Sequence, residues 1–198
     1  MQYIFGYGSL ICSDSRNRTG ISGMAHPVEV SGIARRWSLQ TPEWPATAVS
    51  AHSVPGALCN GVYFAVDQAN LELFDQREMG YDRVEVEWRN VAALSDHALP
   101  TQGALWTYVG RNTGKPSQDK PIMQSYLDVI MDGCLSYGED FARRFTQQTE
   151  LWQHLIDDRH NPQYPRPLKD HKHLPNIDQI LQSQLPDLWR TRTSHRHK

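Results

Sequence analysis

The sequence predicts an α+β domain with a largely antiparallel sheet or barrel. Up to about residue 110, short apolar and aromatic runs alternate with turn residues, as in β-strands, and only one intervening segment has helical spacing. Beyond residues 114–116 (Gly-Lys-Pro), the apolar residues recur at helical spacing instead. Strands followed by helices is the element order typical of this fold class.

The expected strands are apolar runs or segments of alternating polarity bounded by turn residues. They cover residues 3–5, 28–39, 61–66, 81–88 and 103–109, with residues 91–94 as an extension of the fourth. Residues 42–55 contain three prolines and are expected to be looser.

The inserted helix is expected at residues 68–79, with Asp67 as its N-cap and Gly80 at its C-terminal stop. A second helix is expected to begin near Pro121, because proline suits a first helical turn. Shorter helices are expected at residues 141–145 and 151–156.

Length and composition indicate one core domain, residues 1–156, followed by an extension. The 198 residues carry a formal net charge of -2, which gives no reason to expect nucleic acid or a membrane as partner. Three scattered cysteines and the lack of a signal peptide predict a reduced, cytoplasmic protein. The extension, residues 157–198, is rich in proline and histidine, and its basic end, residues 190–198, is expected to be disordered.

The motif FGYGSL at residues 5–10 ends the first expected strand. Glycines at a strand end allow unusual dihedrals and close approach of other atoms, and successive N–H groups in such a turn can hold an anion. A plain tight turn is the alternative. The spacing excludes a dinucleotide fingerprint, which needs a glycine at position 11, where this chain has isoleucine. It also excludes a nucleophile elbow, which needs a glycine two residues before and two residues after Ser9.

Glu78 is the acidic residue best suited to proton transfer. It lies near the expected C-terminus of the helix, where the helix dipole and partial burial would both raise its pKa. A carboxyl group with a pKa closer to neutrality can act as a general base that later returns its proton. Pairing with Arg77 or Arg83 would counteract this effect, and an exposed, neutralised carboxylate is the alternative.

Two further clusters offer weaker hypotheses. Histidines in the extension could bind a divalent metal, but no carboxylates or cysteines accompany them at defined spacing. The basic tail could contact nucleic acid, but no aromatic residues alternate with it, which favours a solvated tail. We therefore expect no metal and no cofactor. The residues considered are His171, His173, His195, His197, Arg190, Arg192, Arg196 and Lys198.

Three segments together resemble the γ-glutamylcyclotransferase superfamily, which includes ChaC-related proteins. Residues 5–10 are similar to its substrate loop, and residues 74–81 (FDQREMGY) resemble the segment holding its essential glutamate. Residues 125–127 (SYL) with the later Gly133-Cys134 are similar to its helix-bearing segment. The resemblance spans about residues 1–150.

The resemblance implies a small, distorted antiparallel β-barrel surrounded by helices. It also implies an enzyme in which the α-amine of a γ-glutamyl group attacks its own side-chain amide, releasing 5-oxoproline and an amine or amino acid. Such an enzyme would be a C–N lyase or acyltransferase of glutathione-type metabolism, acting without a cofactor as a monomer or homodimer. Carried over by position, Glu78 would transfer the proton, and the substrate would be bound by Tyr7, Gly8, Ser9, Leu10 and Tyr126.

The chain also departs from the family pattern. The ChaC-type branch usually follows its loop with tryptophan and proline, whereas residues 11–13 here are Ile-Cys-Ser, and another branch often has asparagine where Leu10 stands. The extension has no counterpart in the family core. These departures leave the substrate open, and a non-catalytic ligand-binding or regulatory module on the same fold is the alternative function.

Overall fold

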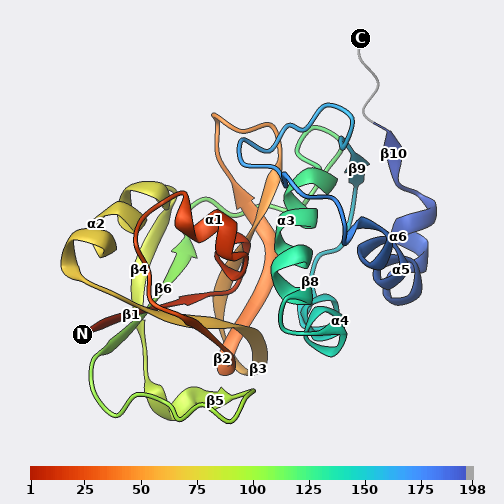
Figure 1. Cartoon of the computed structure of the whole chain (residues 1–198). Coiled ribbons are helices and arrows are strands. Elements are labelled where there is room, and N and C mark those ends of the chain that lie inside the picture. Colours follow the sequence, from red (N-terminus) through yellow and green to blue (C-terminus); the bar gives the residue numbers. More distant parts are fainter. Residues whose placement is uncertain (195–198) are drawn as a thin grey trace.

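The computed structural model describes residues 1–194 and confirms a mixed α+β architecture around a large, mostly antiparallel sheet (Figure 1). Within the sheet, β1 (Gln2–Gly6) pairs in parallel with β6 (Ala104–Gly110). The short β8 (Thr149–Glu150) pairs in parallel with β2 (Ala25–Gln40). The main path of the seven-stranded sheet is β4 (Tyr81–Val86), β6 (Ala104–Gly110), β1 (Gln2–Gly6), β3 (Thr47–Val66), β2 (Ala25–Gln40) and β5 (Val91–Ala93).

The hairpin of β2 and β3 is longer than the sequence predicts. Of the residues expected to be loose, 47–55 belong to the 20-residue strand β3, whereas 42–46 form the turn before it. Pro55 and Gly56 fall within this strand where the pairing with β2 changes register, between Leu58 opposite Ser31 and Ser53 opposite Ile33. A proline there interrupts no ladder hydrogen bond, and the positive φ of Gly56 (79°) suits the irregular backbone.

The hydrogen-bonded path of the sheet stays open. Among residues 1–194, the two terminal strands of the path, β4 and β5, do not pair with each other. A closed barrel is therefore not confirmed, although the antiparallel sheet is.

The helix before Glu78 forms almost as predicted. Helix α2 (Gln68–Arg77) begins after Asp67, whose Oδ1 accepts a hydrogen bond from the Asn70 backbone N–H at 2.8 Å. Its C-cap is Glu78 itself, so the expectation of a stop at Gly80 is wrong by two residues. Residues expected as plain connection contain the 3-10 helix η1 (Ser9–Ile11) and the short helix α1 (Ser13–Asn17).

Helix α3 (Gln124–Leu135) lies at the centre of the molecule, between the sheet and the C-terminal helices (Figure 1). It begins three residues later than predicted, because Ile122–Met123 pairs as strand β7 with β9 (Leu155–Asp157). The helix expected at residues 151–156 is also wrong: Leu151 and His154 have positive φ values of 64° and 51°, and β9 follows. Helix α4 (Glu139–Gln147) contains the predicted segment 141–145.

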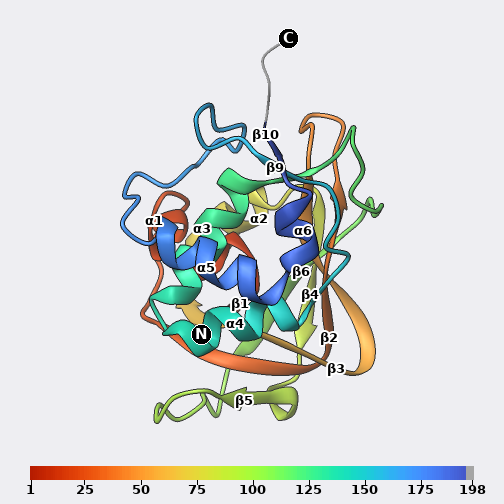
Figure 2. The same ribbon diagram turned by 90° about the vertical axis from the view of Figure 1, so that its right-hand side faces the viewer.

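The C-terminal segment packs on this framework. Helix α5 (Leu174–Gln184) contacts α3 and α4, and α6 (Pro186–Arg190) and β10 (Thr193–Ser194) follow, with β10 beside β9 (Figure 2). Part of the basic end predicted to be disordered, residues 195–198, lies outside the described residues. None of the described helices is both long and apolar enough to span a membrane.

Candidate active site

The loop that follows β1 is shaped by close contacts around its two glycines. A Cβ atom on Gly6 would lie 2.7 Å from Cβ of Leu10, and one on Gly8 would lie 2.7 Å from Cγ2 of Val49. Neither glycine has a positive φ, so space rather than unusual dihedrals requires glycine here. The N–H groups at the start of η1 have no acceptor within that helix and are free to bind a ligand.

Two buried arginines donate hydrogen bonds to carbonyl oxygens of the loop. Nη1 of Arg35 donates to the carbonyl oxygen of Tyr7 at 3.1 Å, and Nη1 of Arg16 donates to the carbonyl oxygens of Leu10 and Ile11, both at 2.7 Å. Arg35 is fully buried and also donates to Asn60, Thr149 and Phe145. The loop is therefore anchored through its carbonyl groups.

Arg77 connects this loop to the candidate acid. Its guanidinium donates to Oγ of Ser9 at 2.9 Å, and its Nε lies 3.0 Å from Oε1 of Glu78. It also donates to Ser15 and Thr19. A single side chain, only 4% exposed, thus fixes the position of Ser9 relative to the Glu78 carboxylate.

Glu78 is mostly buried but reachable, since 14% of its side chain is exposed. Burial raises the pKa of this carboxyl, and the positive charges of Arg77 and Arg166 oppose that effect without cancelling it. Arg83, the other arginine expected to neutralise Glu78, pairs instead with Asp75 at 2.5 Å. The result is a carboxyl group that takes up a proton more readily than an exposed glutamate does.

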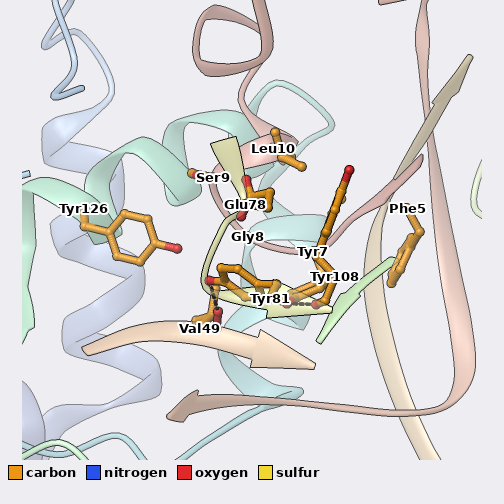
Figure 3. A pocket seen from close by; sticks show the side chains of 11 residues that line it. Phe5, Tyr7, Gly8, Ser9, Leu10, Val49, Glu78, Tyr81, Tyr108 and Tyr126 are labelled. Carbon is orange, nitrogen blue, oxygen red and sulfur yellow. Dashed lines mark hydrogen bonds between the residues drawn. The ribbon is translucent and has the colours of Figure 1, made fainter. Parts of the chain in front are cut away.

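Four tyrosines surround Glu78 and the loop (Figure 3). The hydroxyl of Tyr7 donates to the carbonyl oxygen of Tyr108, that of Tyr108 to Asp75, and that of Tyr81 to the carbonyl oxygen of Val49. Burial raises the pKa of all four hydroxyls, so they remain protonated donors at neutral pH.

Tyr126 differs from the other three tyrosines. Its hydroxyl makes no hydrogen bond to any other residue of the described chain and points toward Glu78 and Gly8 (Figure 3). It lies 3.5 Å from where a Cβ of Gly8 would be. It is therefore the tyrosine with a hydroxyl available to a ligand.

These groups line a narrow hollow, here called the inner pocket, with a volume of about 30 Å³. That space suits a small polar group such as a carboxylate. All six residues that the sequence singles out line it, together with five further residues. Its lining is Phe5, Gly6, Tyr7, Gly8, Ser9, Leu10, Val49, Glu78, Tyr81, Tyr108 and Tyr126.

A wider hollow, the outer pocket, adjoins the inner one and has a volume of about 480 Å³. The two pockets share Ser9, Glu78, Tyr81 and Tyr126. The outer pocket is completed by residues of the extension. Its other lining residues are Glu43, Trp44, Pro45, Ala48, Arg77, Gln163, Tyr164, Pro165 and Arg166.

The histidine cluster is not assembled around this site. His173 pairs with Asp132 at 2.7 Å, and among residues 1–194 no group of three or more His, Cys, Asp or Glu side chains is arranged to hold a metal ion. His195, His197, Arg196 and Lys198 lie outside the described residues. The described tail arginines Arg190 and Arg192 form ion pairs with Asp187 and Asp157.

Comparison with known proteins gives matches in structure only. No model of a protein family matches the sequence, and no curated protein matches it either. A structure described as gamma-glutamyl cyclotransferase superposes with a TM-score of 0.55 and 17% identity over 71% of this chain and 85% of that chain. The uncharacterized protein loc79017 from Homo sapiens superposes with a TM-score of 0.55 and 18% identity, over 71% of this chain and 85% of that chain.

YkqA from Bacillus subtilis matches with a TM-score of 0.51 and 16% identity over 75% of this chain and 55% of its own. These similarities combine low sequence identity with a shared arrangement of sheet and helices. The chain has the γ-glutamylcyclotransferase-like fold.

Proposed function

We propose that this protein is a γ-glutamylcyclotransferase, which converts a γ-glutamyl amine, amino acid or peptide such as glutathione into 5-oxoproline and the released amine. The observation that carries the proposal is the position of Glu78. A mostly buried carboxyl with a raised pKa lines the same narrow pocket as the glycine loop. The structural similarity to a gamma-glutamyl cyclotransferase supports it.

In this reaction the substrate supplies both reacting groups. Glu78 takes a proton from the α-ammonium group, and the freed amine nitrogen attacks the γ-carbonyl carbon. A new C–N bond closes the five-membered ring, and the original amide C–N bond breaks as Glu78 returns the proton to the departing nitrogen. The ring nitrogen gives up its second proton to the released amine, which leaves as an ammonium ion. Because amine and carbonyl belong to one bent molecule, proximity is supplied without a cofactor.

The remaining pocket residues bind the substrate. The N–H groups of the loop, Tyr7 to Leu10, receive the α-carboxylate in the inner pocket. The free hydroxyl of Tyr126 donates to the carbonyl oxygen as it gains negative charge, which stabilises the transition state. The departing group then lies in the outer pocket.

The test is formation of 5-oxoproline from glutathione, γ-glutamyl dipeptides and γ-glutamyl-lysine. We expect Glu78→Gln to lower kcat by at least about 100-fold, the usual contribution of general acid–base catalysis. Glu72→Gln serves as the matched control, since Glu72 is exposed on α2 and outside the pocket. Undiminished activity of Glu78→Gln would contradict the assigned role.

One observation favours a second candidate, a non-catalytic ligand-binding module. The extension contributes Gln163, Tyr164, Pro165 and Arg166 to the wall of the outer pocket, beside Glu78. A module of this kind would bind γ-glutamyl compounds saturably without releasing product. Calorimetry combined with the 5-oxoproline assay on the same samples separates the two functions.

A further inference from the structure

The segment that crosses the outer pocket, residues 158–166 and here called the strap, is fixed to the N-terminus of α3. Asp158 is fully buried and accepts hydrogen bonds from the N–H and hydroxyl of Ser125, at 2.7 and 2.6 Å, and from the N–H of Gln163, at 2.7 Å. The next residue, Tyr164, packs its ring 4.8 Å from that of Tyr126. The strap is thus tied both to α3 and to a site residue.

This attachment brings Arg166 to the outer pocket. Its charge is close enough to Glu78 to lower the pKa of that carboxyl, although burial still dominates. Arg166 is partly exposed, and its guanidinium has no hydrogen bond or ion pair with any other residue of the described chain. Every other arginine among residues 1–194 has at least one such partner.

The charges around Arg166 leave it available to a ligand. Arg77, the other cation of the outer pocket, is occupied by Ser9, Ser15, Thr19 and Glu78. Glu43 lines the same pocket but is exposed, so solvent screens its charge. A guanidinium with free donors, positioned in a pocket, is suited to bidentate binding of a carboxylate.

We propose that Arg166 is a specificity-determining residue that binds a carboxylate on the departing group. This inference rests on the proposed function. With the glutamyl α-carboxylate in the inner pocket, the departing group extends past the shared residues Glu78 and Tyr126 into the outer pocket. The preferred substrates are then γ-glutamyl amino acids or peptides, and γ-glutamyl amines without a carboxylate are poorer ones.

The test uses γ-glutamylalanine and γ-glutamylethylamide, which differ only by the carboxylate. We expect the unmodified protein to prefer γ-glutamylalanine. Arg166→Gln should lower kcat/KM for that substrate about 10- to 100-fold more than for the ethylamide, for which only the effect of Arg166 on the pKa of Glu78 is lost. Arg166→Lys keeps a point charge and should retain part of the preference. Lys169→Gln removes the same charge from an exposed position three residues later and should leave kcat/KM for both substrates unchanged.

An equal fall with both substrates would overturn the inference, because Arg166 would then act only through the pKa of Glu78. If neither substrate yields 5-oxoproline, the proposed function fails, and binding decides the inference separately. Calorimetry on the unmodified protein and Arg166→Gln then measures both affinities. A carboxylate preference that disappears in Arg166→Gln supports the inference, and equal affinities, or no binding, overturn it.

Discussion

At the scale of single residues, Glu78 is subject to two opposing influences. Burial disfavours its charged form, whereas the Arg77 guanidinium at 3.0 Å favours it, and burial is the larger effect on the pKa. The same side chain that would perform the chemistry is therefore a stability cost once it is ionised. This is the pattern expected of an active-site acid.

This balance predicts a pH-dependent stability difference between the unmodified protein and Glu78→Gln. The folded protein holds the Glu78 proton more tightly than the unfolded chain, whose glutamates have a pKa of about 4.3. The free energy of unfolding of the unmodified protein therefore falls as the pH rises from the pKa of Glu78 in the unfolded chain through its higher pKa in the folded protein. Glutamine has no such dependence, so Glu78→Gln should be relatively more stable at pH 7 than at pH 4.

Urea unfolding of both proteins from pH 4 to 8 measures this difference, with Glu72→Gln as the control that should show no such trend. A Glu78→Gln variant that loses relative stability as pH rises would mean that the Arg77 ion pair outweighs burial.

Residue-level prediction from sequence was possible where the signal is local. The loop, residues 5–10, and Glu78 stand in short segments with recognisable neighbours. Arg77 was visible only as a possible neutraliser of Glu78, because its bonds to Ser9, Ser15 and Thr19 reach residues about 60 positions away. Nothing in the sequence indicated that Arg35 is buried or supports the loop. A buried arginine in a strand is explained only by its hydrogen-bond partners, which are distant in sequence.

At the scale of elements, helix α3 and the strap act as one unit. Tyr126 stands in the first turn of α3, where Asp158 binds the N–H and hydroxyl of Ser125. Gly133 near the other end of α3 allows close contact with the segment after the loop, since a Cβ there would lie 2.5 Å from the backbone nitrogen of Cys12. One helix thus sets the positions of Tyr126, the loop and the strap.

Asp158→Ala is expected to loosen this unit. It leaves two buried donors of Ser125 and the partly buried N–H of Gln163 without an acceptor, which should lower the free energy of unfolding by about 3 kcal/mol. The preference for a substrate carboxylate should weaken as well, because Arg166 follows on the strap. Denaturant unfolding and the paired-substrate assay measure the two effects.

Asp170→Ala is the matched control, since Asp170 is exposed and both of its contacts to Lys172, with the backbone N–H at 3.0 Å and with Nζ at 3.7 Å, are exposed to solvent. Its effect on stability should stay within about 0.5 kcal/mol. Equal stability of the two variants would contradict the assigned anchoring role of Asp158.

The element boundaries that sequence patterns misplaced share a tertiary cause. The pattern starting at Pro121 fits a helix, but Ile122–Met123 pairs with β9, whose partner residues lie about 30 positions later. Residues 151–156 carry apolar residues at helical spacing, yet two positive φ values turn the chain into β9. Local propensity cannot register a pairing partner that is distant in sequence.

At the scale of the whole molecule, the segment after residue 157 contributes to the hydrophobic core. Ile177, Ile180 and Leu181 of α5 are at most 1% exposed, and α5 contacts α3 and α4. In the sequence, the spacing of Ile177, Ile180 and Leu181, with Leu185, predicts one or two docked helical turns. The surface that receives them could not be predicted, because α3 is buried by two different parts of the chain.

Ile180→Ala is therefore expected to destabilise the entire domain rather than the C-terminal segment alone. The change removes a buried side chain from a packed contact and should cost about 2–5 kcal/mol. Leu73→Ala, on α2 and 42% exposed, removes a similar side chain at much lower cost. Thermal unfolding should show one coincident, cooperative transition for each variant by near-UV circular dichroism of the aromatic side chains and by far-UV circular dichroism of the backbone. A separate early transition in Ile180→Ala would show that the extension unfolds independently.

The residues that line the outer pocket are synthesised at different times. Ser9 follows the first strand, whereas Tyr164 and Arg166 come after every strand of the seven-stranded sheet. During synthesis the N-terminal part of a chain is available to fold first. A nascent chain that has only reached residue 150 already carries the glycine loop, Glu78 and Tyr126 but has no group to receive a departing carboxylate. On the proposed function, the group that selects the substrate would thus be synthesised after the groups that carry out the reaction.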